Sequence, residues 1–196
     1  MAGRPLIEWS LDVLLDAGCS PVVLVVPERN LDEARALFGQ RESLVITAGG
    51  ETRQDSVASG LEEVSSDVVV VHDGARPFIS VGLVQAVIEA ATEADGAIAA
   101  MPLDETLKRS VGDRIEATVD REDMWRAQTP QAFRTEVLRE AHEKARAEGF
   151  IGTDDASLVE RYGGTVKLVN GGRSNIKVTY PEDFALAEAL VRGGLR

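Results

Sequence analysis

Cysteine is almost absent from this sequence, which contains only Cys19. A disulfide framework is therefore excluded, and no neighbouring residue would turn Cys19 into a nucleophile, so we interpret it as structural. No apolar run approaches the length of a membrane span. No apolar segment of signal-peptide length follows residues 1–5. Together these absences favour a cytoplasmic location.

Basic residues are also scarce, because 21 Lys and Arg face 33 Asp and Glu, giving a net charge of -12. General nucleic-acid binding needs a basic face and is therefore disfavoured. Repeats, linkers and low-complexity segments are absent, and 196 residues with 44% hydrophobic content suit one globular domain. An acidic protein that handles phosphates must gather its cations locally or use a metal.

What the sequence does contain is an alternation of short apolar runs with helical patterns. Strands are predicted at 21–27, 43–48 and 67–71, where continuous aliphatic runs are typical of a parallel sheet covered on both faces. Helices are predicted at about 30–38, 52–64, 80–94, 135–147, 155–162 and 181–192. This order predicts an α/β fold with a doubly wound, mostly parallel, Rossmann-like sheet.

Two stretches depart from that rhythm. Residues 104–133 contain no good helix, and alternation around 110–119 predicts an antiparallel ribbon that projects from the sheet. Such a ribbon is a poor core by itself, so we predict one domain over 1–196 with 104–128 as a dimerisation arm. The chain also opens with an amphipathic helix at 5–17, whereas a doubly wound domain normally opens with a strand and a phosphate-binding turn.

Candidate ligand-binding residues follow the strands. Glycines 49 and 50 precede a predicted helix and allow close backbone approach to an anion, although a simple turn explains them too. Asp73 follows the most apolar strand and is placed for a metal or ligand. Lys177 is expected inside a final strand, where an unpaired cation is costly. We interpret His72 as structural and residues 153–157 as a helix cap.

Three segments in a fixed order carry a family resemblance: His-Asp-Gly-Ala-Arg-Pro at 72–77, Gln-Thr-Pro-Gln at 128–131 and Asn-Ile-Lys-Val-Thr at 175–179. The chain resembles the 2-C-methyl-D-erythritol 4-phosphate cytidylyltransferases of the non-mevalonate isoprenoid pathway, from Ala2 to the last helix. The resemblance implies a nucleotidyltransferase that couples CTP to a phosphorylated sugar alcohol and releases pyrophosphate. Cations and a divalent metal would stabilise the charge of that transition state.

The resemblance also implies roles for individual residues. It implies Mg²⁺ as cofactor, with Asp73 as its ligand and as part of the substrate site. Two catalytic cations would hold the attacking phosphate, and these are Lys177 and Arg121. The cytosine and ribose would be read by Gly50, Glu51 and Ser56, and the phosphate pocket would be completed by Arg76, Thr106 and Thr129. Because the ribbon corresponds to the family's dimer arm, a homodimer is implied, in which Arg76, Thr106 and Arg121 serve the neighbouring subunit.

Some features depart from the family pattern. The family's first strand and Gly-rich loop lie upstream of the point at which this sequence starts, so we expect residues 1–196 alone to bind CTP weakly. Arg173 and Ser174 stand where relatives carry an acidic residue. Two alternatives stay open: a ribitol 5-phosphate cytidylyltransferase, and a catalytically impaired nucleotide-fold protein that only binds or scaffolds.

Overall fold

A computed structural model describes residues 1 and 3–194, so Ala2, the first residue of the resemblance, lies outside the described part. Every helix expected from the sequence is present. The helices are α1 Leu6–Asp16, α2 Leu31–Phe38, α3 Arg53–Leu61, α4 Val81–Thr92, α5 Thr135–Glu148, α6 Asp155–Arg161 and α7 Pro181–Arg192, with a 3₁₀ turn at Glu28–Asn30. The strands are β1 Val22–Val26, β2 Leu44–Ala48, β3 Val68–Val71, β4 Gly96–Pro102, β5 Leu107–Val111, β6 Arg114–Val119, β7 Trp125–Arg134 and β8 Val166–Asn170.

The strands confirm the α/β class and a mostly parallel arrangement, in which β7 is the exception. β1 and β2 form a parallel pair, and a separate four-stranded sheet has the order β3-β7-β4-β8. β7 runs antiparallel to both β3 and β4, whereas β4 and β8 are parallel. The reason is the ribbon: β4 leads out to it and β7 returns directly beside β4, so the two must be antiparallel. β7 is hard to recognise as a strand from the sequence, because it contains Gln128, Thr129 and Pro130. These residue types are not typical of a buried strand, although all three are buried here.

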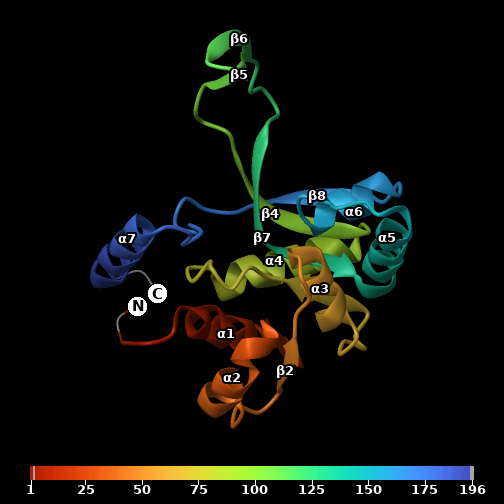
Figure 1. Cartoon of the computed structure of the whole chain (residues 1–196), viewed down its shortest axis with the longest axis vertical. Coiled ribbons are helices and arrows are strands. Elements are labelled where there is room, and N and C mark those ends of the chain that lie inside the picture. Colours follow the sequence, from red (N-terminus) through yellow and green to blue (C-terminus); the bar gives the residue numbers. More distant parts are fainter. Residues whose placement is uncertain (2, 195–196) are drawn as a thin grey trace.

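Helices cover both faces of this framework (Figure 1). On one face, Leu11 and Leu14 of α1 pack with Leu24 of β1 and Val84 of α4. On the other face, a cluster joins α3, α5 and α6 to the sheet, and its members include Leu61, Phe133, Leu138 and Leu158. The doubly wound layering predicted from the sequence is therefore present. In the described part of the chain no helix is both long and apolar enough to cross a membrane.

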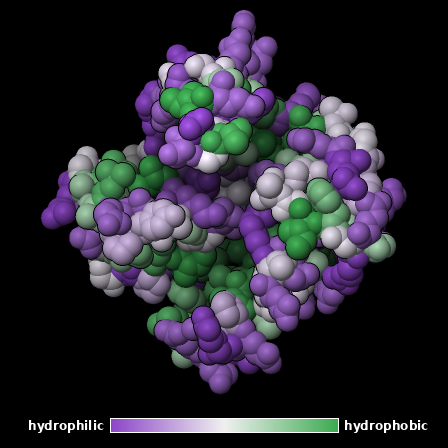
Figure 2. All heavy atoms as spheres, turned by 45° about the horizontal axis from the view of Figure 1, so that its top comes forward, coloured by the Kyte–Doolittle hydropathy of each residue, from purple (hydrophilic) through white to green (hydrophobic). Residues whose placement is uncertain are grey.

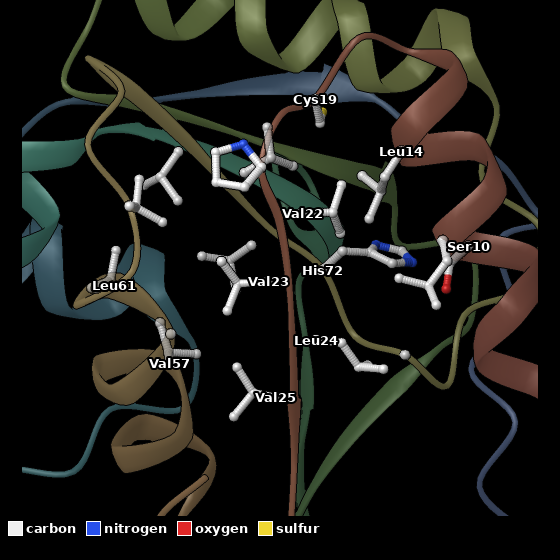
Figure 3. Close-up of a pocket in the computed structure, with 18 of the residues that line it drawn as sticks. Ser10, Leu14, Cys19, Val22, Val23, Leu24, Val25, Val57, Leu61 and His72 are labelled. Atoms are coloured by element: carbon white, nitrogen blue, oxygen red, sulfur yellow. The ribbon is translucent and has the colours of Figure 1, made fainter. Parts of the chain in front are cut away.

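A cavity of about 490 Å³ separates β1 from β3, which do not pair with each other in the described part. Leu14 of α1 lines one side and Val57 of α3 lines the other (Figure 3). The side chains of β1 alternate across it, with Val23 toward α3 and Leu24 toward α1.

The backbone of β1 alternates in the same way. The Val22 amide donates to Ser43 O at 2.8 Å, and the Gly49 amide donates to Val26 O at 2.8 Å. In a parallel ladder every second residue of a strand bonds to the same neighbouring strand, so Val22, Leu24 and Val26 bond to β2 while Val23 and Val25 face the other way. The amide of Val23 therefore points away from β2 and toward the cavity, whereas the amide of Leu24 faces β2.

The predicted ribbon is confirmed as a two-stranded arm of β5 and β6 that projects from the body (Figure 1). Val111 and Ile115 on this arm are each 67% exposed. Figure 2 shows hydrophobic groups among hydrophilic ones where the arm comes forward. At its base Asp104 pairs with Arg126, Nη2 to Oδ1 at 3.2 Å, and with Arg173.

Candidate active site

Three cations surround the carboxylate of Asp73, two residues beyond the end of β3. Lys177 Nζ lies 2.9 Å from Oδ2, Arg53 Nε lies 3.1 Å from Oδ1, and Arg76 Nε lies 3.9 Å from Oδ2. The Asp73 side chain is 15% exposed, and that of Lys177 is 45% exposed. An acidic protein therefore does concentrate positive charge at one strand end, as handling of phosphates requires.

The ionisation of Asp73 follows from these neighbours. Burial by itself raises the pKa of the Asp73 carboxyl, but the hydrogen bond from Lys177 and the charge of Arg53 outweigh burial and hold the pKa below its ordinary value. Burial lowers the pKa of the Arg76 guanidinium, against the opposing effect of Asp73. Asp73 is thus a fixed anion within a surplus of positive charge.

A chain of hydrogen bonds holds the backbone of Asp73 in place. The Asp73 amide donates to Thr129 Oγ1 at 3.0 Å, and Thr129 Oγ1 lies 2.9 Å from His72 Nδ1. His72 Nε2 lies 3.0 Å from the Arg76 carbonyl, which can only accept, so Nε2 carries the proton and Nδ1 accepts from Thr129. Burial lowers the pKa of His72 to about 4. The structural interpretation of His72 is consistent with this neutral, fully bonded ring.

The expectation of a final strand around Lys177 is wrong. Residues 171–179 are irregular, and the Val178 amide donates to Ala75 O at 2.8 Å without forming a ladder. Side chains hold the segment instead: Arg76 Nη1 donates to Asn175 O at 2.8 Å, and Asn175 Nδ2 donates to Thr129 O at 2.8 Å. Lys177 is therefore positioned beside Asp73 by tertiary contacts that no local β-propensity could reveal.

The predicted nucleotide-reading residues lie at the start of α3. Thr52 caps this helix, and its side chain accepts from the Asp55 amide in a capping box. A Cβ at Gly49 would meet Ser56 Oγ at 2.6 Å, and a Cβ at Gly50 would meet Asp55 Cβ at 2.3 Å. The glycines therefore have a structural reason in the close approach of the loop to the helix.

Glu51, beside them, is exposed. Ser56 Oγ donates to Thr52 O at 2.9 Å. Nucleotide reading by Gly50, Glu51 and Ser56 remains a prediction.

The remaining predicted residues are divided between the site and the arm. Arg76 and Thr129 join Asp73 and Lys177 in the cluster, as described above. Thr106 and Arg121 lie on the arm side, are exposed, and make no hydrogen bond or ion pair with Asp73 in the described part. Arg121 Nη1 donates to Asp104 O at the base of the arm.

Sequence reasoning missed three residues behind the cluster. Arg53 Nη1 lies 2.8 Å from Asp155 Oδ2, and His142 Nε2 lies 3.1 Å from Asp155 Oδ1. Asp155 and His142 are 1% and 6% exposed. Residues 153–157 do form a helix cap, through Asp154, but the next residue is an ion-paired buried acid. One signal was available: Arg53 opens a helix, where the dipole disfavours a cation that lacks an acidic partner.

Too few carboxylates gather in the described residues to coordinate a metal ion with protein ligands alone. No group of three His, Cys, Asp or Glu gathers anywhere in residues 1 and 3–194 that could hold a metal. Asp73 supplies one carboxylate, and Arg173, in place of an acid, pairs with Asp104. Mg²⁺ is commonly held by one or two carboxylates together with the phosphates of its substrate. The residues therefore fit a divalent ion whose coordination is completed by a bound ligand.

Fold and site together define a class: an α/β protein with a cluster of cations around a carboxylate at the carboxyl end of a sheet strand. Comparisons with known proteins identify the family within this class. The family model described as IspD, 2-C-methyl-D-erythritol 4-phosphate cytidylyltransferase, matches residues 1–193. This chain belongs to that family.

Individual relatives agree. The chain is 43% identical to the 2-C-methyl-D-erythritol 4-phosphate cytidylyltransferase of Geobacillus kaustophilus, with 97% of this chain and 86% of the relative covered. The crystal structure of that enzyme from Thermus thermophilus is similar, with 41% identity, a TM-score of 0.84 and coverage of 97% and 90%. The 4-diphosphocytidyl-2C-methyl-D-erythritol synthase of Anaerococcus prevotii is 31% identical, with a TM-score of 0.89 and coverage of 97% and 87%.

Proposed function

We propose that this chain is a cytidylyltransferase that transfers the cytidylyl group of CTP to 2-C-methyl-D-erythritol 4-phosphate. The observation that carries the proposal is the Asp73–Lys177–Arg76 cluster, found in a chain that belongs to the cytidylyltransferase family. Such a cluster suits a reaction in which two phosphorylated molecules meet. No feature of the fold or the site favours ribitol phosphate or a purely scaffolding role.

In the reaction a phosphate oxygen of the sugar phosphate forms a bond to the α-phosphorus of CTP. The bond from that phosphorus to the bridging oxygen breaks, and the electron pair leaves with pyrophosphate. Negative charge concentrates at the α-phosphate, where preorganised cations lower the barrier. Lys177, half exposed and able to turn from Asp73, holds and orients the attacking phosphate, and Arg76, anchored on Asn175 O, supplies a second charge.

A divalent ion is part of the proposal. Asp73 would hold it together with the phosphates of CTP, and Mg²⁺ would supply charge neutralisation at the transferred group. The chain's own contribution is the fixed geometry of Asp73, whose amide is bonded to Thr129. The neutral His72 behind Thr129 keeps that hydroxyl oriented.

We further propose that the arm joins two copies of this chain in a homodimer. Exposed Val111 and Ile115 support this, because apolar groups on a projecting two-stranded ribbon need a partner surface. Arg121 and Thr106, which have no hydrogen bond or ion pair with Asp73 in the described part of this chain, would then complete the partner's phosphate pocket. A cytoplasmic location stays a prediction from composition.

The test is turnover by the full-length protein with CTP and Mg²⁺. Pyrophosphate release with 2-C-methyl-D-erythritol 4-phosphate is expected at about one per second or more, with a CDP-linked product identified by mass spectrometry. Ribitol 5-phosphate is assayed in parallel and is expected to react far more slowly. Faster turnover of ribitol 5-phosphate would replace the proposed substrate, and an absence of both turnover and CTP binding heat would indicate a scaffold.

A further inference from the structure

Arg53 occupies a position that is unfavourable for a cation, because it begins α3, where the helix dipole is positive. Two carboxylates compensate. Nε donates to Asp73 Oδ1 at 3.1 Å, and Nη1 donates to Asp155 Oδ2 at 2.8 Å. One planar guanidinium thus joins an active-site carboxylate to a carboxylate of α6. A lysine, with a single nitrogen, could not reproduce this fork.

The Asp155 end of this bridge is anchored. Asp155 is 1% exposed, and its other oxygen lies 3.1 Å from His142 Nε2. The residue after Arg53 fastens the same helix turn: Gln54 Nε2 donates to Phe150 O at 3.1 Å, and Gln54 Oε1 accepts from the Gly152 amide at 3.0 Å. The first turn of α3 is therefore tied to residues 150–155 by three side-chain contacts.

Lys177, the cation nearest to Asp73 Oδ2, is held differently. Its side chain is 45% exposed, and in the described part its ion pair is with Asp73 alone. Oδ1 of Asp73 is thus bound by a cation with a buried second anchor, and Oδ2 by a half-exposed lysine that has no second anion among the described residues, with Arg76 Nε farther away at 3.9 Å.

We propose that Arg53 is a positioning residue. It keeps Oδ1 of Asp73 in place, so that Oδ2 and Lys177 can exchange their mutual ion pair for contacts with the ligand. The role rests on the proposed function of Asp73 in nucleotidyl transfer. It depends on the forked geometry of the guanidinium and on Asp155 behind it, so positive charge alone is insufficient.

The first experiment needs no ligand. NMR measures solvent exchange of the Arg53 Nε proton, which reports its bond to Asp73. Asp155→Asn is expected to accelerate exchange about tenfold, as for loss of a charged hydrogen-bond partner, whereas Lys177→Gln should leave the rate within about twofold. Arg4 Nε, which donates to Glu8 at 3.1 Å, is the internal control and should not change in either variant.

Equal exchange rates in the wild type and Asp155→Asn would overturn the proposal. So would an equal acceleration by Lys177→Gln. If Asp155→Asn does not fold, His142→Gln tests the same anchor by replacing only the outer partner of Asp155, and it should still accelerate exchange measurably.

The second experiment separates geometry from charge in the full-length enzyme. Arg53→Lys keeps the charge and is expected to lower kcat about tenfold with a smaller change in KM for CTP. Arg41→Lys is the matched control, because Arg41 also bridges two carboxylates, Glu8 and Asp12, and its replacement should leave kcat unchanged. Full activity of Arg53→Lys would overturn the proposal. An inactive wild type would refute the proposed function, while the exchange experiment would still decide the role of Arg53.

Discussion

Replacement of Lys177 by Met should damage activity far more than stability. The Lys177 side chain is 45% exposed, and its ammonium pairs with a carboxylate that also has Arg53 at 3.1 Å and Arg76 at 3.9 Å. A partly exposed ion pair contributes about 0.2–1 kcal/mol, and no buried charge is left unpaired. We therefore expect the free energy of unfolding to fall by less than about 1 kcal/mol.

The activity of the Lys177→Met variant should fall much more than its stability. Loss of one preorganised charge contact to a transition state lowers the rate by about a hundredfold, or about 2.7 kcal/mol. We expect this loss in kcat/KM of the full-length enzyme, measured by pyrophosphate release. Denaturant unfolding followed by circular dichroism gives the stability change on the same preparations.

A matched control distinguishes the effect on activity from the effect on stability. Lys167 on β8 pairs with Glu93 and is 43% exposed, close to the exposure of Lys177. Lys167→Met should cost similar stability and leave kcat/KM within about twofold. The reasoning is refuted if Lys177→Met loses less than threefold in kcat/KM, or if both lysine variants lose activity equally.

Three further predictions concern the arm, His72 and the cavity. Mixing Arg121→Ala with Lys177→Ala should restore part of the activity, because one site of a mixed dimer is intact if Arg121 acts across the interface; no recovery despite subunit exchange would place Arg121 in its own subunit's site. Because the folded pKa of His72 is about 4 and its ordinary value is 6.5, the unfolded chain binds a proton first, so stability should fall by up to about 3 kcal/mol as pH drops from 6.5 to 4. His72→Gln should flatten that part of the pH–stability curve, and an unchanged slope would contradict the assignment. Hydrogen exchange at the Val23 amide, which faces the cavity, should be about tenfold faster than at Leu24, and equal protection would contradict the open strand edge.

Much of the fold could be read from local patterns. Aliphatic runs and 3.6-residue periodicity predicted the helices and the strands at 21–27, 43–48 and 67–71, which the structure has at 22–26, 44–48 and 68–71, since burial on one or both faces leaves a direct mark on the sequence. The projecting ribbon was also predicted, from alternation without a helical pattern. β7 escaped because its buried polar residues conceal a strand that is stabilised by pairing on both sides.

The candidate site divides in the same way. The sequence placed Asp73 at a strand end, and the ordered motifs connected it with Arg76, Thr129 and Lys177. The expected strand at Lys177 was wrong, because the short run Ile176–Thr179 has β-propensity but no neighbouring strand with which to form a ladder.

By itself, the sequence determined the class of fold, the family, and which residue types could supply the chemistry, because these depend on composition, periodicity and ordered motifs. Only the tertiary structure decided that Arg53 bridges Asp73 and Asp155, which lies 102 residues away along the chain. It also decided that Arg121 bonds to Asp104 O at the base of the arm. The physical reason is that a salt bridge depends on distances of a few ångströms between side chains, and packing of distant segments sets those distances.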